Sequence, residues 1–491
     1  MRAGKAVAIV AAGLALWCSP ALAQPAPAWS PQPWIEDLAQ MRGAIETKYA
    51  NLEWLLTERE FDLAGLFTRA EAALRNARDD TQARSVFDRV MQRIGDGHVG
   101  LSWPRPSAPA PAGAAGPPGP VPPATVEGFC RARGVDGPSP GLGPSLAGYV
   151  PAETGEVVPG GTARVGATRV GVLRIAKFEP GGLLSLCTEA VTALNVPLGQ
   201  PCDEACEDRI LTRTYRRLSA AVEERLLSLR AAGAEVLVVD LTGNGGGSEW
   251  VQAVARMLTP RRLVSQRRGF VRGAHWAGTW TRLGEQLRGF AATASAEDRP
   301  RLLAWAAEAD AARAEAERTC PPTGGGASCP WVATAGYATG FVGSARAGEF
   351  EGREWAPWIF NPAQYPYRDG VWTGPVVVLV DDGTASAAEE MAAMLQDNRA
   401  AIILGSRTAG AGCGHTWGGT PTRLANSGAI LSVPDCVRVR ADGSNEVRGV
   451  IPDRLIGWRS SDGRRLRARM LEAALPDAIA AARALHRRSA P

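Results

Sequence analysis

One serine in the chain stands where a nucleophile could be held and activated. The segment Asp382–Glu389 (DGTASAAE) follows an apolar run, Val376–Val380, that predicts a buried strand, and it leads into a helix predicted over 385–398. Ser386 is therefore expected at a strand-to-helix turn, where the free N–H groups and the dipole of the helix favour negative charge. This position suits a nucleophilic serine. The alternative is that Thr384 or Ser386 only caps the helix.

A second segment, Asp240–Ser248 (DLTGNGGGS), follows another buried strand predicted over 235–240. Its glycines allow backbone N–H groups to point at a ligand without interference from side chains. The spacing does not fit a dinucleotide site, because Ser248 stands where the last glycine of that motif would be, and a phosphate-binding loop would need a lysine that is absent. Taken alone, the segment could equally be a plain tight turn.

Taken together, the two segments resemble those of the tail-specific serine proteases. A later Gly-x-Arg-Thr-x-Gly sequence at 405–410 follows in the family's order. The wider family includes the C-terminal processing peptidases, the tricorn core protease and the interphotoreceptor retinoid-binding protein. The resemblance implies that Ser386 is the nucleophile. It also implies that the N–H groups of Ala387 and Gly246 form the oxyanion hole that stabilises the tetrahedral intermediate.

The general base departs from the pattern of the processing peptidases. Their lysine falls 25 residues after the serine, and Ala411 occupies that position here. Only Lys48 and Lys177 remain once a signal peptide is removed, so a Ser/Lys dyad is not expected. The tricorn-like branch uses a histidine, and Gly95–His98 (GDGH) resembles its Asp-Gly-His segment. The resemblance implies His98 as the base, because a neutral imidazole can take the serine proton at pH 7.

A third group should orient the histidine ring. Glu446 matches the glutamate of the tricorn-like branch, three residues before the Gly449–Asp453 turn (GVIPD), and the resemblance gives it this role toward His98. The branch also has a serine directly before the histidine, where this chain has Gly97. His415 is a competing base, because it lies in the glycine-rich stretch that follows the missing lysine.

The elements that must position these residues fall into distinct regions. Helical periodicity predicts a small N-terminal bundle over 30–100, in which Thr57-x-x-Glu60 predicts a capping box that opens the second helix. A Pro/Ala/Gly-rich linker follows over 104–126. Short strands alternating with helices then predict an α/β core over 127–465, with a helical insertion near 280–320.

A helix is predicted over 466–491 at the end of the chain. The family resemblance implies a crotonase-like spiral core, in which a twisted sheet is flanked by helices and capped by the bundle. The histidine would then come from the bundle and the serine from the core. The Pro- and Gly-rich composition of 104–165 predicts that the PDZ module of the processing peptidases is absent.

The first 23 residues predict export. They combine a short basic start, an uncharged apolar run over Ala6–Trp17 and a small-residue cleavage signal at Ala21–Ala23, which together indicate a signal peptide over 1–23. The protein is therefore expected in a periplasmic or extracellular compartment, with no integral membrane segment after cleavage.

Eight cysteines remain after cleavage, and an even number in an oxidising compartment predicts disulfides. The expected pairs include Cys320 with Cys329 and Cys413 with Cys436. A zinc site is the alternative, but Cys202-x-x-x-Cys206 has no matching His/Cys pair nearby.

Composition narrows the class of protein. The 54 Lys+Arg and 50 Asp+Glu give a net charge of only +4, which argues against nucleic acid as a partner, and the 45% hydrophobic content excludes a disordered chain. The family resemblance and the predicted signal peptide together imply an exported serine-type endopeptidase that cleaves peptide or protein substrates and needs no metal or organic cofactor. The oligomeric state is left open. The alternatives are a catalytically silent ligand- or peptide-binding protein on the same fold and a crotonase-like acyl-CoA enzyme.

Overall fold

The computed structural model describes residues 29–104, 123–134, 139–152, 157–180, 183–321 and 329–488. The predicted signal peptide and most of the predicted linker lie outside these ranges. No helix in the described part of the chain is both long and apolar enough to cross a lipid bilayer.

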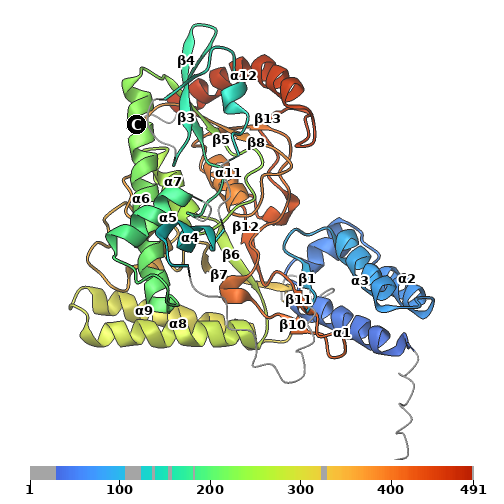
Figure 1. Cartoon of the computed structure of the whole chain (residues 1–491). Coiled ribbons are helices and arrows are strands. Elements are labelled where there is room, and N and C mark those ends of the chain that lie inside the picture. Colours follow the sequence, from blue (N-terminus) through green and yellow to red (C-terminus); the bar gives the residue numbers. More distant parts are fainter. Residues whose placement is uncertain are drawn as a thin grey trace, which may run out of the picture.

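A seven-stranded sheet forms the centre of the core (Figure 1). Its strands, in spatial order, are β13 (Arg454–Leu455), β9 (Ile402–Gly405), β8 (Val376–Val380), β5 (Val236–Asp240), β4 (Thr168–Arg174), β3 (Gly160–Val165) and β2 (Val150–Pro151). The first five are parallel to their neighbours, and β3 and β2 add to one edge in antiparallel fashion. The strands predicted over 235–240 and 376–380 lie side by side at its centre.

Helices cover both faces of this sheet, which explains why β5 and β8 are continuously apolar. Leu237 and Val239 face the helices α6 (Glu204–Ala231), α7 (Trp250–Met257) and α11 (Ala387–Asp397). Val236 and Val238 point to the other face, against α12 (Arg464–Arg487). The α/β class with a twisted sheet flanked by helices is therefore confirmed.

A second, three-stranded sheet extends the core toward the insertion. Its order is β12 (Cys436–Val439), β6 (Arg267–Val271) and β7 (Val332–Tyr337), all antiparallel. Between β6 and β7 the chain forms the helical hairpin α8 (Ala274–Thr293) and α9 (Asp298–Glu317), seen at the lower edge of Figure 1. The insertion predicted near 280–320 is helical as expected, although it begins six residues earlier.

The N-terminal region is helical as predicted. It contains α1 (Gln32–Lys48), the π-helical turn η1 (Trp54–Glu58), α2 (Leu63–Arg75) and α3 (Asp80–Ile94). The predicted capping box at Thr57 and Glu60 is wrong. Asp62 caps α2 instead, because its carboxylate accepts a hydrogen bond from the Gly65 N–H at 2.8 Å.

The bundle docks on the core through backbone pairing and shared packing. Strand β1 (Gly100–Ser102), which follows the bundle, pairs with β11 (Ile430–Ser432), and β11 pairs with β10 (Thr422–Arg423). Figure 1 shows the bundle as a lobe beside the core, joined at these strands. One hydrophobic cluster runs from the bundle through β11 and β6 into α8 and α9.

Four disulfides are formed among the described residues. The two expected pairs, Cys320–Cys329 and Cys413–Cys436, are both confirmed. Cys130–Cys187 joins α4 (Val126–Arg131) to α5 (Leu184–Ala193). Cys202–Cys206, considered above as part of a zinc site, forms the fourth disulfide, at the start of α6.

The short helix α10 (Ala356–Ile359) lies in the segment between β7 and β8.

Candidate active site

Ser386 lies at the N-terminus of α11, in the turn that follows β8. Its backbone has φ 55° and ψ −118°, a conformation that L-residues rarely adopt and that costs about 1–3 kcal/mol. The turn is held from both sides: the Ala385 N–H donates to the Asn244 carbonyl at 2.9 Å, and the Thr384 hydroxyl donates to the Leu241 carbonyl at 3.0 Å. The two motifs separated by about 140 residues therefore meet, and they fix the strained serine.

A buried carboxylate connects this turn to the loop that follows β9. Glu389 Oε2 accepts hydrogen bonds from the N–H groups of Ser386 at 2.9 Å and Ala411 at 2.8 Å. Its Oε1 accepts from the Thr408 hydroxyl and the Gly410 N–H, both at 2.6 Å. A buried carboxylate with several donors is well stabilised, so Glu389 locks the position of the loop relative to the serine. Sequence reasoning missed this residue, although the spacing Ser-x-x-Glu was a usable signal.

Two neighbouring glycines of the first motif have different roles in the geometry. The Gly246 N–H donates to Asn244 Oδ1 at 2.8 Å, so this donor is occupied. A Cβ on Gly246 would lie 2.7 Å from Ser386 Cβ and 2.9 Å from the Ala387 nitrogen, which explains why the position needs glycine. Gly247 lines the cleft beside Ser386 and Ala387, and its N–H has no hydrogen-bond partner within the described ranges.

His98 comes from the turn between α3 and β1. Asp96 fixes this turn by accepting hydrogen bonds from the His98 N–H at 2.9 Å and the Tyr49 hydroxyl at 2.7 Å. The ring Nδ1 lies 2.8 Å from the Ala411 carbonyl oxygen. Because a carbonyl only accepts, Nδ1 carries the proton of the neutral ring, and Nε2 is left as an acceptor. The other side of the ring packs on Gly414, where a Cβ would lie 3.0 Å from Nε2.

His415, the competing base, lies in the same cleft. Its ring meets that of His98 edge to face, with centroids 5.9 Å apart. Partial burial and then the nearby charge of His98 lower the pKa of His415. The structure thus brings both candidate bases to the cleft, while only His98 has a ring nitrogen held by the loop that Glu389 fixes.

Glu446 lies behind Ser386, through Arg438. Its carboxylate is buried and contacts Arg438 at 2.7 Å and Gln266 at 3.4 Å, and His98 is not among its hydrogen-bond partners in the described part of the chain. Arg438 in turn donates to the Ser386 carbonyl at 2.9 Å. The sequence offered no signal for Arg438, because its partners come from three separate segments.

Burial and the surrounding carboxylates act in opposite directions on this pair. Burial lowers the pKa of Arg438, but Glu446 and Glu390 raise it more, so the guanidinium stays charged. Burial raises the pKa of Glu446 to about 7 against the opposing effect of Arg438. Glu390 is the second carboxylate partner of Arg438, at 3.1 Å. Arg438 is therefore held rigidly, with one side on carboxylates and the other on the serine backbone.

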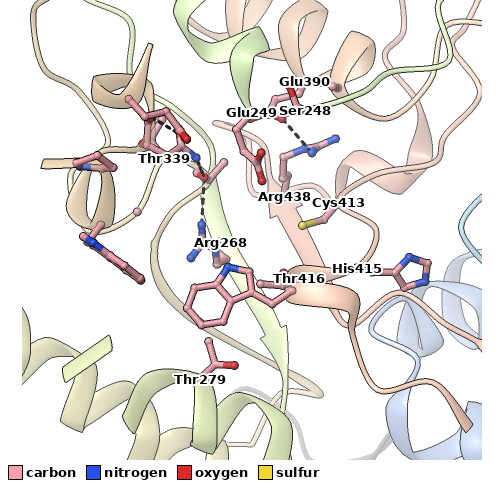
Figure 2. Close-up of a pocket in the computed structure, with 18 of the residues that line it drawn as sticks. Ser248, Glu249, Arg268, Thr279, Thr339, Glu390, Cys413, His415, Thr416 and Arg438 are labelled. Atoms are coloured by element: carbon pink, nitrogen blue, oxygen red, sulfur yellow. Dashed lines mark hydrogen bonds and ion pairs between the residues drawn. The ribbon is translucent and has the colours of Figure 1, made fainter. Parts of the chain in front are cut away.

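These residues line a cleft of about 720 Å³. Figure 2 shows Arg438, Glu390 and Ser248 on one side of it and Thr279 on the opposite side. Ser386, Ala387, Gly247, His98 and His415 all contribute to its wall. The helical hairpin and the segment after β7 supply large apolar side chains, namely Trp280, Leu283, Phe341 and Trp358. The cleft is large enough to bind several residues of an extended peptide beside the serine.

Comparison with known proteins agrees with this fold. The crystal structure of mature CPAF superposes with a TM-score of 0.55 at 13% sequence identity, covering 94% of this chain and 99% of that one. Mature CPAF complexed with lactacystin gives a TM-score of 0.54 at 14% identity, covering 93% and 99%. No curated protein matches by sequence. A model of peptidase family S41 matches residues 169–456, more than half of the chain. The chain therefore belongs to peptidase family S41 and is a serine-type peptidase.

Proposed function

We propose that this chain is an exported serine endopeptidase of the tricorn-like type, with Ser386 as nucleophile and His98 as general base. One observation carries the proposal: both side chains line a single cleft, Ser386 in strained backbone at a helix N-terminus and His98 with Nδ1 held by a carbonyl. An imidazole oriented through one nitrogen presents the other to a substrate-side proton, as general-base catalysis requires.

The proposed reaction follows from these positions. His98 Nε2 takes the proton of Ser386 Oγ as the oxygen attacks the carbonyl carbon of a peptide bond. The protonated ring then gives its proton to the leaving amine, and the acyl-enzyme forms. A water molecule, deprotonated by the same nitrogen, releases the acyl group and restores the serine.

The developing oxyanion needs two donors beside the serine. The Ala387 N–H is the first, since it opens α11 next to the nucleophile. We assign the second to Gly247 rather than to the expected Gly246, because the Gly246 N–H already donates to Asn244 Oδ1. Such preorganised donors contribute about 10²–10³-fold in rate.

Glu446 is assigned a positioning role that differs from direct contact with His98. It holds Arg438, and Arg438 holds the carbonyl of Ser386, so Glu446 acts on the nucleophile through one intervening side chain. Glu446→Gln is expected to lower kcat while KM stays unchanged, whereas removal of His98 abolishes the chemistry.

Export is supported by two independent features. The sequence of residues 1–23 has the three parts of a signal peptide, and four disulfides join all eight cysteines that remain after its removal. Disulfides persist in oxidising compartments, which favours a periplasmic or extracellular location.

The test uses the oxidised mature protein, residues 24–491, with an unbiased peptide library and mass spectrometry. Wild type is expected to cleave, and Ser386→Ala and His98→Ala are each expected to lose at least about 10³-fold in kcat/KM. Persistent cleavage by the serine variant would exclude Ser386. Loss in His415→Ala with retention in His98→Ala would move the base to His415. Absence of cleavage by folded wild type would favour a binding protein.

A further inference from the structure

Arg268 is a charged side chain in the cleft that the proposed reaction does not use. It lies on β6, is half-buried and lines the cleft that contains Ser386. Figure 2 shows its guanidinium in the middle of the cleft, between Thr339 and Thr279. Its Nη2 donates to the Ala338 carbonyl at 3.1 Å, and its other two nitrogens have no hydrogen-bond partner in the described ranges.

The charge of Arg268 is not neutralised by an ion pair. No carboxylate oxygen of the described residues lies within 4.0 Å of its guanidinium, and Glu249, which also lines the cleft, is beyond that distance. Arg438, the other arginine of the cleft, differs because Glu446 and Glu390 both contact it. Glu249, Glu390 and Asp435 act on Arg268 from beyond ion-pair distance, and Glu390 is already paired with Arg438. Because a partly desolvated cation without a direct ion pair is costly, an anionic partner from the substrate would stabilise it.

The strand register places Arg268 close to the nucleophile. Arg268 and Arg438 are directly opposite each other in the antiparallel pair of β6 and β12. Residues directly opposite in such a pair project to the same face of the sheet. Since Arg438 reaches the Ser386 carbonyl at 2.9 Å on that face, Arg268 emerges beside the same end of α11.

The surroundings suit a carboxylate better than a neutral group. Arg268 presents free N–H donors in a fork that matches the two oxygens of a carboxylate. Trp280 and Phe341 line the same cleft, and a charge-assisted hydrogen bond is stronger beside such apolar side chains, where the local dielectric constant is lower. The burial of Arg268 also lowers its pKa, and a bound carboxylate would reverse that effect.

We propose that Arg268 forms a specificity subsite for an acidic side chain, Asp or Glu, of the substrate close to the scissile bond. This inference rests on the proposed peptidase function and adds a substrate class to it. Glu249 also lines the cleft and carries the opposite charge, which would favour a basic residue. A preference for acidic residues therefore requires that Arg268 contribute more to substrate binding than Glu249 does.

The first test compares pairs of synthetic peptides taken from sites cut in the library. Each pair differs only by Glu→Gln or Asp→Asn near the cut. Wild type is expected to prefer the acidic member by about 10–100-fold in kcat/KM, as a charge-assisted hydrogen bond allows. Arg268→Gln should remove this preference while it still cleaves the neutral member.

Arg267→Gln is the matched control. It removes the same charge from the adjacent residue of β6, which is exposed, lies outside the cleft and stacks on Tyr337. It is expected to keep the acidic preference. An equal loss of preference in both variants, or no acidic preference in wild type, would overturn the proposal.

A second pair of peptides, with a free and an amidated C-terminus, tests whether Arg268 binds an acidic side chain or the terminal carboxylate. Amidating the C-terminus should leave the dependence on Arg268 unchanged. If amidation abolishes it and the Glu→Gln exchange does not, the arginine recognises a terminal carboxylate and the side-chain subsite is wrong.

A binding measurement keeps this inference distinct from the proposed reaction. Labelled acidic peptides and their amide counterparts are titrated into Ser386→Ala and into the double variant that also carries Arg268→Gln, with fluorescence anisotropy as the readout. Tighter binding of the acidic member only when Arg268 is present supports the subsite even if no cleavage occurs. Equal affinities of both members for Ser386→Ala overturn it.

Discussion

Ser386 and His98 face one cleft, but Ser386 is positioned by neighbouring elements in the sequence and His98 by a contact between distant segments. The serine side is local: β8, a short turn and α11 are continuous in sequence, and β8 and most of α11 are buried. The histidine side is assembled from distant parts, since His98 leaves the bundle and is held against Ala411, more than 300 residues later. The first arrangement is set by a rigid core, and the second depends on how well the bundle docks.

The docking contact beside His98 is small. Strand β1 begins two residues after His98 and contributes only three residue pairs to β11. The turn also relies on Asp96 and on the loop fixed by Glu389. Errors in docking should therefore affect the histidine first, whereas the serine turn should tolerate them until the core itself unfolds.

The largest effect is expected on the serine side, at Gly246. Gly246→Ala places a Cβ within 2.9 Å of the backbone at Ala385 and Ala387, atoms that cannot move without displacing Ser386. We expect kcat/KM to fall by about 10²-fold or more, because displacements of this size disrupt catalytic alignment. Gly243→Ala is the control: it also has a positive φ, +67° against +106° for Gly246, but a Cβ there meets nothing within 4 Å. Equal losses in the two variants would contradict this reading.

A smaller effect is expected at the matching glycine of the histidine side. Gly414→Ala brings a Cβ to 3.0–3.2 Å from the His98 ring, which can yield by a few tenths of an ångström. We expect about a 10-fold loss of kcat/KM. Gly418→Ala has nearly the same φ, +80° against +85°, and open space around the Cβ. Both variants should lose about 1–2 kcal/mol of stability in urea unfolding, but only the first should lose activity.

Docking itself is tested by a pair of buried leucines. Leu431 lies in β11 opposite Leu101, and Leu475 lies in α12 on the far face of the main sheet. Each change to Ala should cost about 2–5 kcal/mol of unfolding free energy. Only Leu431→Ala should also reduce kcat/KM, by several-fold, because it loosens the pairing of β11 with β1, the strand that follows His98. Similar activity in both variants at a temperature where both are folded would show that β1 does not position the histidine.

The difference between locally built and long-range structure also explains which features could be predicted from the sequence. Continuous apolar runs identified β5 and β8 almost to the residue, and the serine turn followed from them, because these features depend on neighbours in the chain. The pairings of Cys320 and Cys413 were also found, since their partners are near in sequence.

Features that depend on the three-dimensional path of the backbone were not accessible from the sequence. The capping box at Thr57 fits the local sequence pattern, and only the π-helical turn at Trp54–Glu58 shows that α2 begins later, with Asp62 as its cap. Gly246 was predicted as an oxyanion-hole donor because a sequence does not show that Asn244 occupies its N–H. Arg438 carried no signal for the same reason.

The smallest expected effect concerns the protonation of the histidine side. His415 has a lowered pKa in the folded protein, through partial burial and the charge of His98. Unfolding therefore takes up a proton as the pH falls below about 6.5, the ordinary value of a histidine, and this lowers stability on the acidic side. His415→Gln should lose less unfolding free energy than wild type between pH 7.5 and pH 5.5.

The difference should be roughly 0.5 kcal/mol or less, because the ring is exposed enough for solvent to screen the charge. His486→Gln, on the exposed end of α12, is the control for removing an imidazole outside the cleft and should not reproduce the effect of His415→Gln. A steeper acid loss in His415→Gln than in wild type would show that the charged ring is stabilised in the fold. In that case, repulsion between His98 and His415 would not contribute to the stability of the site.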